Sequence, residues 1–279
     1  MMLNNRQKCL YYFLRKSERC SKMQLVKIFF LMSRESNIDE RGKFYSFVPY
    51  KFGPYSFELF HDVEIMEQEK LVAIDGNDIT FVGGSNIIPV ESVPIIDQYF
   101  EDYFFINEKK LINIVYEKYP DYTIFSKIKK KKEYVRDLTG VYTIGYEGRS
   151  VDEFLLKMID EKIQILADVR NNPWSLKYGY SKQNLEVFCD KLGIRYMNIP
   201  SLGIPSSLRK DLNDKEAYEK LFTMYRSYLM KRTDELQYLK SLSKKQRIAL
   251  MCFERDPNYC HRGILAKELE KIGAEVELN

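Results

Sequence analysis

The alternation of short apolar runs with amphipathic segments over residues 140–279 most constrains what this chain can fold into. The apolar runs have the length and composition of buried strands, and the segments between them repeat apolar residues at helical spacing. Strand–helix alternation of this kind predicts an α/β domain, a mostly parallel sheet flanked by helices. We expect strands at 141–146, 163–169, 195–199, 247–252 and 275–278, and helices at 151–161, 182–192, 215–232, 235–242 and 263–272.

The most chemically loaded stretch joins the fourth expected strand to the last expected helix. Between Met251 and Arg262 it contains Glu254, two cysteines, His261 and two arginines. Turns at the carboxyl ends of parallel strands are where open α/β sheets bind ligands, because backbone N–H groups and the positive end of a helix dipole meet there. This turn is therefore the first candidate for a functional site.

Charged residues also follow two other expected strands. Glu147 and Arg149 come after the first strand, and Asp168 and Arg170 lie at the end of the second. Parallel strands bring these ends to one edge, where Arg149, Arg170 and Arg262 predict a receptor for phosphate or another anion, with Arg262 the strongest choice. Asp168 or Glu254 can orient an arginine or act as a base. A structural salt bridge is the equal alternative for Asp168 and Arg170.

Cys260 has three interpretations. A helix start beside His261 and Arg262 lowers the pKa of a thiol and favours a nucleophile. A helix whose N-cap is Asp256 instead puts Cys260 on the apolar face, which favours a buried core residue. Metal binding with Cys252 and His261 is disfavoured, because adjacent side chains seldom face one ion and no second Cys-His pair completes the site. The sequence thus predicts no metal site and identifies no cofactor.

Two other residues complete the expected site. His261 is suited to hydrogen bonding or general base catalysis, since a helix N-terminus favours its neutral form. Trp174, the only tryptophan, lies in a long turn after the second strand and can stack on a planar ligand. A lid or a core anchor is the alternative for Trp174.

Residues 1–90 are predicted to form a separate helical, winged-helix-like domain. Helices are expected at 6–14, 22–33 and 56–69, with Ser21 as a cap, followed by a hairpin at 71–82. The aromatic stretch Phe47 to Ser56 resembles a signature of GepA-like proteins and SocA-type antitoxins, a Panacea-like domain. That resemblance implies recognition of a partner protein. Burial of Tyr50, Phe52 and Tyr55 in the core is the alternative.

Residues 91–139 are expected to connect the two domains through helices at 95–106 and 111–119. A basic run follows these helices and predicts either contact with nucleic-acid phosphates or a solvated linker. Its lysines are Lys127, Lys129, Lys130, Lys131 and Lys132.

The composition indicates the cellular compartment in which the chain is expected. The five cysteines are odd in number and scattered, as in reduced intracellular proteins. No apolar run is long enough for a membrane span, and the start lacks a signal-peptide pattern. We therefore expect a cytoplasmic protein without a membrane partner. The net charge of +4 permits a polyanionic ligand without requiring one.

The second domain resembles the DUF488 family through four motifs in order. They are the segments 142–150, 168–175, 202–203 and 252–262, and they span nearly the whole domain. The resemblance implies the α/β fold and this set of residues, but no reaction. One departure is visible, since many members have His-Ser where this chain has Tyr146-Glu147.

Together these features lead to two hypotheses. The first is an enzyme acting on a phosphorylated compound, a nucleotide or a nucleic-acid end in an anion-binding cleft of the DUF488-like domain. The second is a regulatory protein that binds nucleic acid or a protein partner and uses the α/β domain as a ligand sensor.

Overall fold

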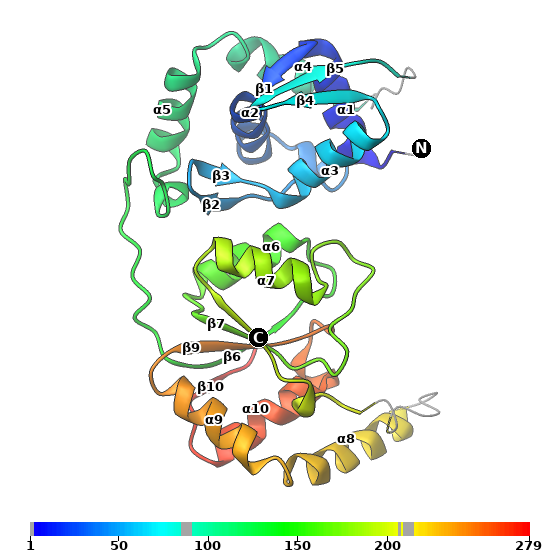
Figure 1. Cartoon of the computed structure of the whole chain (residues 1–279), viewed down its shortest axis with the longest axis vertical. Helices are drawn as coiled ribbons and strands as arrows, with labels where there is room; N and C mark the ends of the chain where they lie inside the picture. The colour runs from blue at the N-terminus through cyan, green and yellow to red at the C-terminus, as the bar shows by residue number, and fades with distance from the viewer. Residues whose placement is uncertain (1–2, 85–90, 206–207, 209–214) are drawn as a thin grey trace. The chain divides into compact units, whose positions relative to one another are not determined.

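The computed structural model describes residues 3–84, 91–205, 208 and 215–279 (Figure 1). The chain divides into two compact units, Met1–Tyr134 and Val135–Asn279. The boundary lies close to the predicted end of the connector. Each unit has its own core and is described by itself.

Three helices form the centre of the first unit: α1 (Asn5–Ser17), α2 (Lys22–Glu35) and α3 (Phe57–Gln68). Side chains of Asn4, Ser21 and Ser56 accept a backbone N–H at their respective N-termini, and the predicted cap Ser21 is confirmed. All residues from Leu25 to Met32 are buried, so α2 is enclosed on every side.

Two small sheets accompany these helices. Strands β1 (Arg19–Ser21), β4 (Val72–Asp75) and β5 (Asp78–Phe81) form an antiparallel sheet in the order β1-β5-β4, which confirms the predicted hairpin at 71–82. Strands β2 (Val48–Tyr50) and β3 (Gly53–Tyr55) pair as a second hairpin. The winged-helix arrangement of the unit stays a prediction.

The segment predicted to be a connector differs from expectation. Its helices α4 (Val93–Tyr103) and α5 (Glu108–Lys118) pack on α2, and their apolar residues belong to the first core. The reason is that α2 is apolar on all faces and needs helices on more than one side. Short 3-10 turns at Ile38–Arg41 and Pro120–Thr123 complete the unit.

The basic run follows the second of these turns without helix or strand. Its five lysines are exposed, apart from the partly covered side chain of Lys131. Lys131 and Lys132 form ion pairs with Glu117 and Asp121. Two of the five charges are thus partly neutralised within the unit, and nucleic-acid binding by this run stays a prediction.

The second unit is built on a five-stranded sheet in which every neighbouring pair is parallel, as predicted. The order is β10-β6-β9-β7-β8, so β9 lies between β6 and β7. The strands are β6 (Gly140–Gly145), β7 (Ile165–Asp168), β8 (Arg195–Asn198), β9 (Arg247–Cys252) and β10 (Val276–Glu277).

Helices cover both faces of this sheet (Figure 1). One face carries α6 (Val151–Asp160) and α7 (Lys182–Lys191). The opposite face carries α8 (Lys215–Leu229), α9 (Thr233–Ser243) and α10 (His261–Lys271), which share a core with the strands. Full coverage explains why all residues of β6, β7 and β9 are buried. Among the described residues, no helix is long and apolar enough to cross a membrane.

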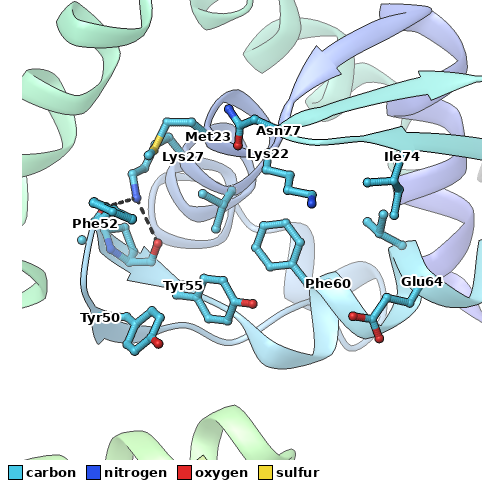
Figure 2. Close-up of a pocket in the computed structure, with 14 residues that line it drawn as sticks. Lys22, Met23, Lys27, Tyr50, Phe52, Tyr55, Phe60, Glu64, Ile74 and Asn77 are labelled. Atoms are coloured by element: carbon cyan, nitrogen blue, oxygen red, sulfur yellow. Dashed lines mark hydrogen bonds between the residues drawn. The ribbon is translucent and has the colours of Figure 1, made fainter. Parts of the chain in front are cut away.

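A cavity of about 310 Å³ lies in the first unit, between α2, α3 and the β2–β3 hairpin (Figure 2). Tyr55 and Phe60 stack in its wall with ring centroids 4.8 Å apart. Tyr50 and Tyr55 are only partly buried and Phe52 is 48% exposed, so the expected burial of these three rings is wrong. The hairpin turn projects Phe52 outward while its carbonyl points inward to Lys27.

The buried amine of Lys27 joins the cavity wall to the hairpin. Its Nζ donates to the carbonyls of Phe52 (2.5 Å) and Pro54 (3.0 Å), and only 1% of the residue is exposed. Burial lowers the pKa of Lys27 to about 7. Because an unfolded lysine has a pKa of about 10.4, the folded chain binds fewer protons between these two values, and stability rises with pH in that window.

This linkage predicts how Lys27→Met changes the dependence of stability on pH. From about pH 7 to about pH 9, the free energy of unfolding of the first unit should rise by about 2 kcal/mol more in the original protein than in the variant. Urea denaturation of both proteins at the two pH values measures the difference. Equal changes in the two proteins would show that Lys27 keeps its proton in the folded state.

Candidate functional site

Three strands of the second unit end side by side. In the register of the sheet, Gly145 of β6 pairs with Cys252 of β9, and Asp168 of β7 pairs with Met251. The segments after these strands are therefore brought to one edge, as the sequence predicts. Glu147 confirms their contact, because its Oε2 accepts a hydrogen bond from the backbone N of Arg255 at 3.0 Å.

Asp168 and Arg170 form a buried pair at this edge. Arg170 Nε and Nη2 donate to the two carboxylate oxygens of Asp168 at 2.8 and 2.6 Å. Tyr196, on β8, donates to the same carboxylate at 2.8 Å. Asp168 is fully buried and Arg170 is 6% exposed, so the alternative of a structural salt bridge is the one observed.

Aromatic rings enclose the rest of the Arg170 guanidinium. It donates to the hydroxyl of Tyr146 at 3.1 Å and to the carbonyl of Tyr180 at 2.9 Å, and the two tyrosine rings stack 4.2 Å apart. Burial alone lowers the pKa of Arg170, but the hydrogen bonds and charge of Asp168 raise it above its ordinary value. Arg170 stays charged and ties the segments after β6 and β7 together.

Arg262 is likewise internal, which makes the prediction of an exposed anion ligand wrong for this residue. Its side chain is fully buried. One Nη donates to the carbonyl of Glu254, and the other donates to the carbonyls of Arg255 (2.7 Å) and Asn279 (3.3 Å). The physical reason is that a turn leaves carbonyls without strand or helix partners, and a buried guanidinium satisfies several of them at once.

Two glycines let the turn after β9 approach its neighbours closely. A Cβ on Gly145 would lie 1.9 Å from the carbonyl oxygen of Glu254, and one on Gly263 would lie 2.1 Å from that of Pro257. The backbone of the turn thus crosses directly over the end of β6. Only residues without a side chain permit this crossing.

Cys252, Cys260 and His261 meet beneath the turn. Their ligating atoms all lie within 4.8 Å of one another, and all three residues are buried. His261 Nδ1 is 3.5 Å from Cys252 Sγ and 3.9 Å from Cys260 Sγ. The other ring nitrogen, Nε2, is 3.1 Å from the carbonyl of Val169 and therefore donates a hydrogen bond to it. An edge-on contact with Tyr225 fixes the ring further.

The backbone explains why two adjacent side chains converge here. A short 3-10 turn, Pro257–Tyr259, follows Asp256, and Cys260 is the extended N-cap of α10 with φ −134° and ψ 144°. Asp256 therefore caps this short turn and not α10, and the burial of Cys260, one of its three interpretations, is confirmed. The change from extended to helical backbone turns Cys260 and His261 toward the same point, contrary to the objection raised from sequence.

Glu254 adds a carboxylate to this group. Its Oε2 is 3.3 Å from Cys252 Sγ, and the residue is partly exposed. Burial and the charge of Cys260 raise the pKa of Glu254. Burial also opposes ionisation of Cys260, but its hydrogen bond with Cys252 and the electrostatic effects of His261 and Arg262 lower its pKa. The pKa of Cys252 is raised, first by its hydrogen bond to Cys260.

Exposed rings surround the same edge. Trp174 is 64% exposed, which excludes the core-anchor alternative, and Phe253 and Tyr259 are 46% and 72% exposed. Phe253 contacts the ring of Tyr146 edge-on, at 5.3 Å between centroids. Arg255 is exposed and Arg149 is partly exposed, and no side-chain hydrogen bond or ion pair is found for either among the described residues.

Three tyrosines of the candidate site are not predicted from the sequence. Tyr146, Tyr180 and Tyr196 hold the Asp168–Arg170 pair, yet each stands in an aromatic-rich chain where nothing distinguishes it. Tyr146 was noted only as a departure from a family pattern. Its position directly after a strand that carries a predicted site was the available signal.

The comparisons with known proteins agree with the fold of the second unit. Residues 150–269 match a family model described as "Domain of unknown function DUF488", which confirms the predicted resemblance of the second unit to that family. No significant match was found among curated proteins or among solved structures. The resemblance of the N-terminal segment to GepA-like proteins and SocA-type antitoxins stays a prediction.

The internal role of Arg262 leads to a stability prediction. Arg262→Met leaves three carbonyls without their donor and should lower the free energy of unfolding of the second unit by about 3 kcal/mol. Arg255→Met, at an exposed position in the same turn, is the matched control and should change it by less than about 0.5 kcal/mol. Urea denaturation followed by circular dichroism measures both. Similar stabilities of the two variants would contradict the assignment.

Proposed function

We propose that the second unit is an enzyme that acts on a nucleotide or on a nucleic-acid end held at the carboxyl edge of its sheet. The observation that carries this proposal is the presence of exposed aromatic rings and arginines around a buried group of two thiols, an imidazole and a carboxylate. Binding surface and reactive groups thus occur together at one end of the sheet.

The rings supply the part of the site suited to bases. Trp174 belongs to the segment between β7 and α7, whereas Phe253 and Tyr259 belong to the turn after β9. Lys177, in the first of these segments, donates to the carbonyl of Tyr146 at 3.1 Å, and this bond holds the segment over the end of β6. Exposed rings stack on bases, and each stacked base contributes about 1–3 kcal/mol.

Arginines supply the part suited to phosphate. Arg170 and Arg262 are internal, so this role passes to Arg149 and to Arg255. The backbone N of Arg255 is bonded to Glu147, which brings the segment after β9 against the segment that carries Arg149. Guanidinium groups bind phosphate oxygens in pairs, and such charge-assisted bonds are among the stronger ones in proteins.

The group formed by Cys252, Cys260, His261 and Glu254 favours an enzyme over a protein that only binds a ligand. Two cysteines and a histidine are packed together with a carboxylate that reaches toward the surface. A binding protein has no need of so many ionisable groups at one point, and they are costly to bury. Glu254 is the partly exposed member of the group and therefore the one accessible from solvent.

The single tryptophan provides a direct test of binding. Titration with nucleotides and with short 5′-phosphorylated single strands should quench the fluorescence of Trp174, because a stacked base contacts the indole. The double variant Arg149→Ala/Arg255→Ala should raise the Kd by about tenfold or more, with a weaker dependence on salt. Lys191→Ala, a change at the far end of α7, is the control and should leave the Kd unchanged. Fluorescence that responds to none of these ligands would contradict the proposal.

Turnover is tested separately by incubating the same ligands with the protein and analysing the products by mass spectrometry. Glu254→Gln should abolish product formation while leaving the quenching of Trp174 within about twofold, since it removes a charge without removing the rings. Binding without any product in the original protein would refute the enzymatic role and favour ligand recognition instead.

A further inference from the structure

We propose that Cys252, Cys260, His261 and Glu254 together bind one zinc ion. Two sulfurs and an imidazole nitrogen lie within 4.8 Å of one another, and a carboxylate oxygen adjoins them. Sulfur and nitrogen ligands in a four-coordinate set are those that zinc prefers in proteins. The proposal concerns metal binding itself and holds whether or not the proposed substrate is correct.

Three distances between the ligand atoms are close to those of a tetrahedral site. Zinc lies about 2.3 Å from sulfur and about 2.0–2.1 Å from nitrogen or oxygen, so tetrahedral ligands are separated by about 3.6 Å. His261 Nδ1 lies 3.5 Å from Cys252 Sγ and 3.9 Å from Cys260 Sγ. Glu254 Oε2 lies 3.3 Å from Cys252 Sγ. The two sulfurs and the imidazole nitrogen are thus already grouped around one point, and rotation of the Glu254 side chain supplies the fourth ligand.

The histidine is already oriented as a metal ligand. Its Nε2 donates to the carbonyl of Val169 at 3.1 Å, which fixes the tautomer and leaves the Nδ1 lone pair directed at the two sulfurs. Metal-bound histidines commonly donate their other ring N–H to a backbone carbonyl, which fixes the orientation of the ring. The edge-on packing of Tyr225 against the ring holds this orientation without using either nitrogen.

The rest of the fold supplies a rigid frame for the ligands. Cys252 is the last residue of β9, a central strand, and His261 is the first residue of α10. Arg262 holds the intervening turn in place through the carbonyls of Glu254 and Arg255. Three ligands are buried and Glu254 alone is partly exposed, so the carboxylate closes the site on the solvent side.

Metal content measured by inductively coupled plasma mass spectrometry tests the proposal. Protein dialysed against micromolar zinc and then against metal-free buffer should retain about one zinc per chain, as four-coordinate sites do. Cys252→Ser, Cys260→Ser and His261→Gln should each retain less than about one tenth of that amount, and Glu254→Ala should release the ion faster to a chelator. Cys189→Ser is the matched control, because Cys189 is a buried thiol of the same unit on α7.

Cobalt provides a second readout that needs no variant to fold. Addition of Co²⁺ to the metal-free original protein should give the intense visible bands of a tetrahedral ion and a thiolate-to-cobalt charge-transfer band. Zinc should displace both. Circular dichroism identifies any variant that loses metal only because it is unfolded.

Two results would overturn the proposal. One is an original protein that retains no zinc and gives no thiolate–cobalt band. The other is a Cys189→Ser variant that, while folded, loses as much metal as Cys252→Ser. Neither measurement uses a substrate, so failure of metal binding is distinguishable from failure of the proposed nucleotide binding.

Discussion

The buried guanidinium of Arg262 is the interaction on which the turn after β9 depends. Its three carbonyl acceptors belong to the turn after β9 and to the last residue of the chain, so it joins that turn to α10 and to the edge of the sheet. With the turn held over Gly145, Cys252 and Glu254 face the start of α10. By donating several hydrogen bonds, the Arg262 guanidinium fixes the turn that contains Glu254 and leads to Cys260.

The order and type of the elements in the second unit could be read from the sequence because apolar periodicity is a local property. Every expected strand and helix between residues 141 and 279 has a counterpart, within a few residues at its ends. The role of α4 and α5 could not be read in this way. It depends on the number of apolar faces that α2 must cover, which is a property of the assembled core.

The sequence predicted that the segments after β6, β7 and β9 meet at one edge of the sheet, but not how their side chains are bonded. The sequence places charged residues after strand ends, and the structure brings those ends together. Whether an arginine side chain faces solvent or the interior depends on nearby backbone carbonyls that need a donor, and a sequence does not show these. Arg170 and Arg262 point inward because they donate to such carbonyls. The convergence of Cys260 and His261 depends on one change of backbone conformation between neighbours. Trp174 is exposed and Arg149 is partly exposed.

The packing of α4 and α5 against α2 determines where the first unit can end without exposing its core. A gene segment that ended near codon 90 would encode α2 without two of the helices that shield it, and its product would present a large apolar surface to aggregation. A junction close to Tyr134 and Val135 instead keeps the whole first core within one module. The basic run, residues 127–132, lies before this junction and therefore stays with the first unit.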